Sequence, residues 1–122
     1  MSRAASAARV PDQTGRTVVI TGASAGLGAA LTSRFARLGA DVVLAVRNVA
    51  KGERAAGQIR SAHPDASLRV MELDLADLAS VRSFADAFSA SHDRLDVLIN
   101  NAGVMAVPYG QTADGFEMQI GT

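Results

Sequence analysis

Apolar residues follow two alternating patterns along the chain. Four short apolar runs, at residues 17–20, 42–46, 68–75 and 95–100, contain many β-branched residues. Runs of this kind are typical of strands that are buried on both faces of a parallel sheet. Between these runs, apolar residues recur every three or four positions over 27–38, 49–62 and 78–88, which predicts amphipathic helices.

The alternation of strands with helices predicts the arrangement of the fold. Such alternation indicates βαβ units and a parallel sheet. Right-handed crossovers then place the strands in the order 3-2-1-4. The expected fold class is therefore α/β: the first four strands of a Rossmann-like, doubly wound parallel sheet with helices on both faces.

The residues that flank the helical patterns are those that begin and end helices. Asn48 and Asp77 stand where N-caps belong, because their side-chain oxygens can accept from first-turn N–H groups. Gly39 follows the first pattern as a C-terminal cap, and Pro64 closes the second because proline cannot continue a helix. A last helical pattern begins with Phe116, and the sequence stops inside it. The fourth strand is then expected to be an open sheet edge, which predicts loose packing or self-association.

Composition excludes several classes of partner. The chain is 48% hydrophobic and 20% charged, which is typical of a globular protein. Its net charge is zero, so electrostatics give no reason to expect nucleic acid or a membrane surface. No apolar run approaches the roughly 20 residues of a membrane span. The absence of cysteine fits a reducing compartment, and we expect a cytoplasmic location. His63 and His92 fall at predicted helix ends without partners at ligand spacing, so no metal site is expected.

The most informative stretch is Thr17–Gly28, TVVITGASAGLG, in which a strand runs through a glycine-containing turn into a helix. Glycines let the backbone approach an anion, and the N–H groups at a helix start favour negative charge. The spacing Gly-x-x-x-Gly-x-Gly differs from the ordinary dinucleotide fingerprint Gly-x-Gly-x-x-Gly. The turn alone therefore predicts a phosphate site, with a tight turn that binds nothing as the alternative.

Three motifs together resemble the short-chain dehydrogenase/reductase family. Thr21–Gly28 is similar to the family's Thr-Gly-x-x-x-Gly-x-Gly cofactor motif, and Asn100–Gly103 is similar to its Asn-Asn-Ala-Gly motif. Asp74-Leu75 is similar to its adenine-contacting position. The resemblance covers about residues 12–122, and residues 47–53 and 114–117 are most similar to the retinol-dehydrogenase and protochlorophyllide-reductase branch.

The resemblance implies a dinucleotide site at the carboxyl ends of the strands. Backbone N–H groups over residues 24–27 would hold the pyrophosphate, and the Ser24 hydroxyl can donate to a phosphate. The Asp74 carboxylate would accept from the adenine amino group, and the Leu75 N–H would donate to a ring nitrogen. Residues 101–103 would lie where the adenosine ribose passes close to the backbone. Asn100 is expected to be structural, its side chain tying neighbouring strands together.

The end of the second strand decides between the two nicotinamide dinucleotides. Sites for NAD usually place an Asp or Glu there, which bonds the ribose 2′-hydroxyl. In this chain Val46 holds that place and Arg47 follows it. A guanidinium can pair with a 2′-phosphate in a bidentate fork, so NADP (NADPH) is the predicted cofactor. The predicted cofactor-contacting residues are Gly22, Ser24, Ala25, Gly26, Leu27, Gly28, Arg47, Asn48, Asp74, Leu75, Asn101, Ala102 and Gly103.

The catalytic groups that the resemblance implies do not occur in this sequence. In the family, a Tyr exchanges a proton with the substrate oxygen, and a Lys four residues later lowers its pKa while a Ser orients the carbonyl. The chain has one tyrosine, Tyr109, with Ala113 four positions later, and one lysine, Lys51. We therefore assign no catalytic residue and expect no catalysis by this chain alone.

Two hypotheses follow for the chain as a whole. In the first, it is the NADP(H)-binding N-terminal part of an oxidoreductase that, when complete, acts on a small carbonyl or alcohol substrate. In the second, it is a stand-alone nucleotide-binding or protein-interaction module without catalysis. Residues 1–13, rich in Ala, Ser and Arg, are expected to be a flexible leader, with a targeting segment as the alternative. Residues 14–122 are expected to be the NADP-binding Rossmann-like domain, incomplete at its C-terminus.

Overall fold

The computed structural model describes residues 11–105 and 107–122, so most of the predicted leader lies outside the described residues. Gln13, which the leader prediction included, is 5% exposed, and its N–H donates to the Leu38 carbonyl at 2.8 Å. Strands and helices alternate in the predicted way, as β1 (Thr17–Thr21), α2 (Gly26–Arg37), β2 (Asp41–Val46), α3 (Val49–Ala62), β3 (Ser67–Glu72), α4 (Leu78–Ser91), β4 (Val97–Ile99) and α5 (Met118–Gly121).

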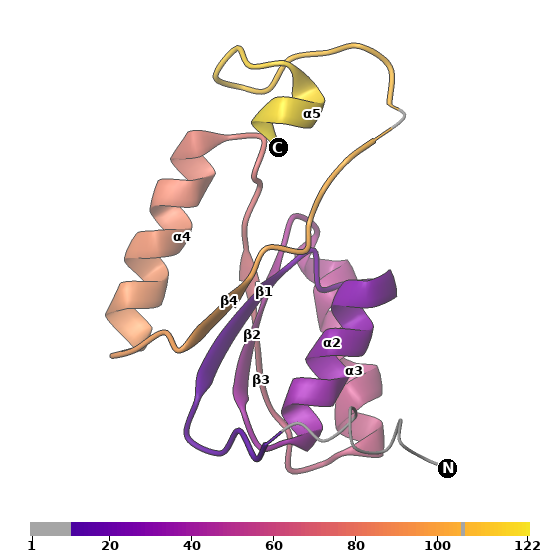
Figure 1. The fold of residues 1–122 in the computed structure, drawn as a ribbon, viewed down its shortest axis with the longest axis vertical. Helices are drawn as coiled ribbons and strands as arrows, with labels where there is room; N and C mark the ends of the chain where they lie inside the picture. Colours follow the sequence, from indigo (N-terminus) through magenta and orange to yellow (C-terminus); the bar gives the residue numbers. More distant parts are fainter. Residues whose placement is uncertain (1–10, 106) are drawn as a thin grey trace.

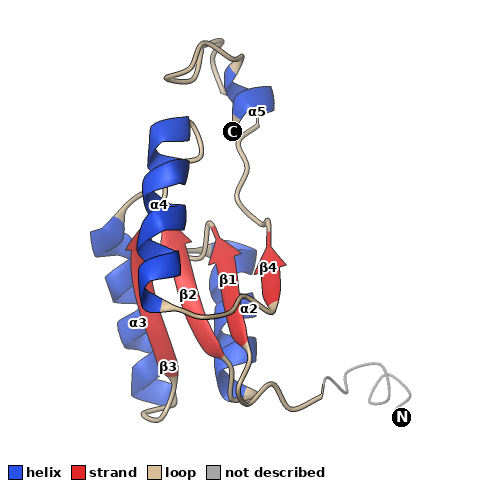
Figure 2. Cartoon of the chain, turned by 90° about the vertical axis from the view of Figure 1, so that its left-hand side faces the viewer, coloured by secondary structure: helices blue, strands red, loops and turns tan. Residues whose placement is uncertain are grey.

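The four strands form one parallel sheet in the order β3-β2-β1-β4, which confirms the predicted topology. Helices α2 and α3 cover one face of the sheet, and α4 lies on the other face (Figure 1). All four strands point the same way, so their carboxyl ends meet at one edge (Figure 2). The loops that follow the strands therefore gather at that edge.

The continuous apolar runs of β1 and β2 are explained by a core on each side of the sheet. Val18, Ile20, Val42 and Leu44 point toward α2 and α3 and are 0% exposed. The intervening residues face α4, where Val19, Val43 and Ala45 pack with Phe88. Because successive strand residues point to opposite faces, a strand buried on both sides has no polar alternation.

The two outer strands are shorter than the sequence predicts. The predicted third strand ran to Leu75, but β3 ends at Glu72, and the predicted fourth strand of residues 95–100 is reduced to Val97–Ile99. Both are edge strands, with a neighbour on one side only, so the apolar residues after them are used in loops and packing. On β4, Leu98 lies on the same face of the sheet as α4. Helix α4 does not cover it, and its side chain is 50% exposed.

Capping residues define the helix starts. The side chain of Asn48 accepts from the Lys51 N–H at 3.0 Å, and that of Asp77 accepts from the Ala79 N–H at 3.0 Å. Both predicted N-caps are confirmed. A second carboxylate reaches the start of α4 from far along the chain, because Asp114 Oδ2 accepts from the Leu78 N–H at 2.8 Å. The predicted last helix begins later than Phe116, after Glu117, whose carboxylate caps it.

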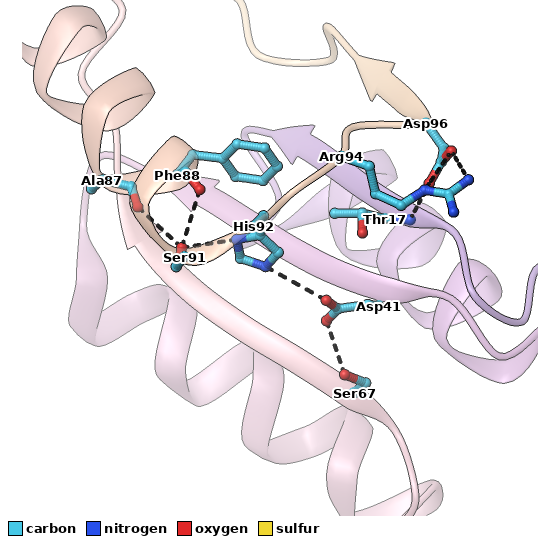
Figure 3. Close-up of polar contacts among 9 residues, drawn as sticks. All are labelled: Thr17, Asp41, Ser67, Ala87, Phe88, Ser91, His92, Arg94 and Asp96. Carbon is cyan, nitrogen blue, oxygen red and sulfur yellow. Dashed lines mark hydrogen bonds and ion pairs between the residues drawn. The ribbon is translucent and has the colours of Figure 1, made fainter.

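His92 joins α4 to the amino-terminal edge of the sheet (Figure 3). It caps the C-terminal end of α4, and its ring stacks on Phe88 with centroids 4.5 Å apart. Its Nε2 lies 3.5 Å from a carboxylate oxygen of Asp41, the first residue of β2, and the other oxygen of Asp41 accepts from Ser67 Oγ at 2.9 Å. This histidine therefore has a packing role at the edge opposite the candidate site.

Asp96 joins β1 to the turn before β4 at the same edge (Figure 3). Its Oδ2 accepts from the Thr17 N–H at 2.8 Å, and the Arg94 guanidinium binds both of its oxygens. The Arg94 hydrogen bonds, helped by the Thr17 N–H, hold the pKa of Asp96 below its ordinary value of 3.8. The carboxylate therefore stabilises the folded chain above that pH, and this contribution is lost as the pH falls through the folded-state pKa.

We predict that Asp96→Asn lowers the thermal unfolding midpoint at pH 7 because the charge-assisted bonds from Arg94 are lost. The difference from the wild type should shrink as the pH falls below 3.8, where the native carboxyl also becomes protonated. The matched control is Asp93→Asn, an exposed neighbour. Equal destabilisation by Asp96→Asn at pH 7 and pH 3 would contradict the electrostatic account.

Candidate functional site

The carboxyl edge of the sheet holds a cavity of about 300 Å³. Its lining comes from the ends of β1 and β2 and from the loops that follow all four strands. Three predicted motifs, separated by up to about 80 positions in the sequence, meet around it. Nine of the thirteen predicted cofactor-contacting residues line this cavity: Gly22, Ser24, Arg47, Asn48, Asp74, Leu75, Asn101, Ala102 and Gly103.

The glycine turn after β1 needs two of its glycines for space. A Cβ on Gly22, whose φ is +63°, would lie 2.9 Å from the Cα of Ala102. A Cβ on Gly28 would overlap the Gly22 carbonyl oxygen and lie 2.7 Å from Asn101 Nδ2. Gly28 therefore lies behind the cavity, where it lets α2 pack close to the end of β1.

The start of α2 offers N–H groups beside the cavity. Within the described residues, no side chain caps this helix, whose N-cap is Ala25. A helix start without a side-chain cap leaves donors that can bind an anion. Ser24, Ala25 and Gly26 line a neighbouring hollow between α2 and α3, and the Leu27 side chain is 67% exposed. Ala25, Gly26 and Leu27 are thus on the open surface next to the cavity, and the half-buried Ser24 borders both hollows.

The Thr21 side chain holds the ends of β1 and β4 together. Its Oγ1 accepts from the N–H groups of Asn101 and Ala102, both at 3.0 Å. In return, Asn101 Nδ2 donates to the carbonyls of Thr21 and Gly22 at 3.2 and 3.3 Å. The strand-tying role expected of Asn100 is therefore wrong. Asn101 makes this tie, whereas Asn100 is exposed and lines a groove on the α4 side, because successive residues point to opposite faces.

Asp74 and Leu75 lie in the loop after β3, two and three residues beyond the end of the strand. Leu73 continues the sheet by donating its N–H to the Val46 carbonyl at 2.8 Å. Asp74 Oδ1 accepts from the Ala76 N–H at 2.9 Å, and Ser80 Oγ accepts from the Asp74 N–H at 2.9 Å. These contacts fix the loop, and one carboxylate oxygen of Asp74 is already used within it.

Arg47 and Asn48 follow β2 and lead directly into α3. Arg47 is exposed at the cavity wall. Lys51, which the predicted site did not include, also lines the cavity, from the first turn of α3. The signal for it was its place three residues after the predicted N-cap Asn48, in the first turn of the helical pattern, which puts a second cation near the strand end that carries Arg47.

The remaining predicted features lie elsewhere. Tyr109 is 80% exposed in the loop after β4. The described residues contain no group of three or more side chains that could hold a metal ion. Across residues 11–105 and 107–122, no helix is both long enough and apolar enough to cross a membrane.

The fold defines a class of protein, the Rossmann-like α/β proteins with a parallel sheet and a glycine turn after the first strand. The short chain dehydrogenase family matches residues 16–119. The chain belongs to this family, as its three motifs indicated.

Individual relatives agree with this assignment. Retinol dehydrogenase 14 of Mus musculus is 51% identical over 117 residues, a match that covers 88% of this chain and 35% of that protein. Retinol dehydrogenase 12 of Homo sapiens is 49% identical over 107 residues, covering 88% and 34%. The chain spans about a third of the length of these curated relatives.

Solved structures share the fold. The crystal structure of an uncharacterized protein from Mycobacterium Paratuberculosis is 54% identical, with a TM-score of 0.82, over 95% of this chain and 40% of that one. A metagenomic short-chain oxidoreductase in complex with NADP is 39% identical, with a TM-score of 0.71, over 76% of this chain and 41% of that one.

We predict that Thr21→Val destabilises the chain by about 1–3 kcal/mol, because the Ala102 N–H loses its acceptor and the Asn101 N–H keeps only the Ile99 carbonyl. Urea unfolding followed by circular dichroism measures this change. The matched control is Thr17→Val on the same strand, whose hydroxyl makes no hydrogen bond within the described residues. Equal destabilisation by the two variants would show that the hydroxyl of Thr21 is not the stabilising group.

Proposed function

We propose that this chain binds NADP(H) in the cavity at the carboxyl edge of the sheet. The observation that supports it best is the set of groups around that cavity. Glycine backbone, the uncapped start of α2 and two cations meet there, although they come from separate parts of the sequence. The NADP bound by a 39% identical oxidoreductase supports the same assignment.

The groups present fit a dinucleotide that carries a 2′-phosphate. Where Gly22 approaches Ala102, the only side chain of the pair is the Ala102 methyl group, so a ribose and a pyrophosphate can lie close to backbone there. Arg47 follows the end of β2, and Lys51 lies in the first turn of α3. Proteins that bind the cofactor without the 2′-phosphate usually have a carboxylate at the end of this strand. Asp74 and Leu75 form the wall of the cavity on the β3 side, where the adenine would lie.

We further propose that the chain is the N-terminal, cofactor-binding part of an oxidoreductase that acts on carbonyl or alcohol groups. The bound cofactor would supply or accept a hydride. The residues of this chain would bind its adenosine and pyrophosphate, and so orient the nicotinamide toward a site built by other residues. The sequence contains no Tyr-x-x-x-Lys pair, so proton transfer to the substrate is assigned outside it. A cytoplasmic location, suggested by the lack of cysteine, completes the proposal, and cell fractionation tests it.

We predict that Arg47→Ala raises the Kd for NADPH about tenfold, the effect of losing one charge-assisted hydrogen bond. The Kd for NADH should change little, because NADH has no 2′-phosphate. Fluorescence titration with both reduced cofactors measures the ratio. Arg82→Ala, an exposed arginine on α4 away from the cavity, is the control. An unchanged NADPH to NADH ratio in Arg47→Ala would refute the assignment of the 2′-phosphate contact.

We also propose that the chain associates with a second copy of itself through the open face of β4. A groove of about 520 Å³ lies there between the sheet and α4, with Phe84 and Phe88 among its apolar walls. Leu95 and Leu98, at 46% and 50% exposure, are part of its lining. The unpaired backbone N–H and C=O groups of an edge strand can bond to a strand of another chain. Covering the exposed apolar side chains also removes them from water, which favours association.

We predict that Leu98→Lys shifts the chain toward the monomer in sedimentation equilibrium, because a charge on the open face of β4 opposes its burial. The control is Leu78→Lys, which changes a residue of similar exposure, 41%, at the start of α4 outside the groove. A wild-type chain that is monomeric at every concentration tested would refute the proposed self-association.

A further inference from the structure

Gly52, in the first part of α3, is a buried glycine with no room for a side chain. A Cβ at this position would lie 2.7 Å from Cγ2 of Val46 and 2.9 Å from Cγ1 of Val70. Both are methyl groups of β-branched side chains on neighbouring strands, and such side chains have little rotamer freedom with which to move aside. Helix α3 and the carboxyl ends of β2 and β3 are therefore closer together here than any larger residue allows.

A second glycine in the same helix shows that this contact is specific to one position. A Cβ on Gly57 would meet nothing within 4 Å. Glycine is a poorer helix former than alanine, so each of the two glycines weakens α3 in the same way. Only at Gly52 does the missing side chain allow close packing against the sheet.

The contact lies directly beneath the cationic side of the cavity. Val46 is the last residue of β2, Arg47 follows it, and Lys51 precedes Gly52. The Gly52 N–H donates to the Asn48 carbonyl at 3.0 Å, and the Asn48 side chain accepts from the Lys51 N–H at 3.0 Å. Asn48 thus ties the first turn of α3 to the end of β2. Lys51 lies on that turn, and Arg47 immediately precedes Asn48.

We infer that Gly52 is a positioning residue that sets the preference for the phosphorylated cofactor. The inference rests on the proposed binding of NADP(H). A Cβ at Gly52 pushes the first turn of α3 away from β2 and moves Lys51 and Arg47 with it. Because charge-assisted hydrogen bonds act only over a short range, such a shift weakens the hold on a 2′-phosphate. The groups proposed to hold the adenine and the pyrophosphate lie in the loops after β1, β3 and β4, which are not part of α3, so we expect them to move less.

The test compares Gly52→Ala with Gly57→Ala in the full 122-residue chain. Affinities for NADPH and NADH are measured by fluorescence titration, and circular dichroism checks the fold of each variant. For Gly52→Ala we expect the Kd for NADPH to rise about tenfold while that for NADH changes less than about twofold. Gly57→Ala should leave both affinities as in the wild type.

A second pair of variants separates positioning from general damage. In the Arg47→Ala background, adding Gly52→Ala should change the NADPH to NADH ratio much less than it does alone, because the two changes act on one contact. Adding Val70→Ala to Gly52→Ala removes one of the two methyl clashes and should restore part of the ratio. If Gly52→Ala alone fails to fold, the affinities for NADPH and NADH are measured on this double variant instead.

Each outcome decides a separate question. A wild-type chain that binds neither cofactor would overturn the proposed function, and the role of Gly52 with it. If the wild type prefers NADPH and Gly52→Ala binds both cofactors as Gly57→Ala does, the proposed function stands and the role of Gly52 is wrong. Equal weakening of both cofactors by Gly52→Ala would likewise overturn it, leaving a purely structural glycine.

Discussion

The structure depends on the close approach of β1 and β4 at their carboxyl ends. Two short loops meet there without intervening side chains, because Gly22 has none and Ala102 has only a methyl group. The Thr21 hydroxyl and the Asn101 amide supply the hydrogen bonds that the backbone needs at this point. Next to Gly22 and Ala102 the cavity is therefore lined by backbone and one methyl group, and Arg47, Lys51 and Asp74 belong to other parts of its lining.

The central strands could be predicted from the sequence because burial on both faces leaves continuous apolar runs, and their order followed from the right-handed crossovers of βαβ units. The edge strands were less predictable. Residues 73–75 are as apolar as a strand, yet Leu73 packs under α4 while Asp74 closes a turn through its own side chain. A pattern of apolar residues records burial, and burial in a loop gives the same pattern as burial in a strand.

The candidate site was also predictable only in part. Its motifs could be found by spacing, because each follows a strand and strand ends share one edge. The roles of Asn100 and Asn101 could not be separated in this way, since two adjacent asparagines differ only in the face to which each points. Lys51 was missed because a single lysine in a helical pattern is typical of a solvated surface, and its place at the cavity wall is set by how α3 packs on the sheet.

The pairing of β1 between β2 and β4 also bears on how the chain is made. The bonds that close the phosphate turn join residues 80 or more positions apart, whereas β1 and β2 are neighbours along the chain. Contacts between distant residues form slowly, and during synthesis the later partner must first leave the ribosome. The glycine turn therefore leaves the ribosome about 80 residues ahead of its hydrogen-bonding partners in the loop after β4.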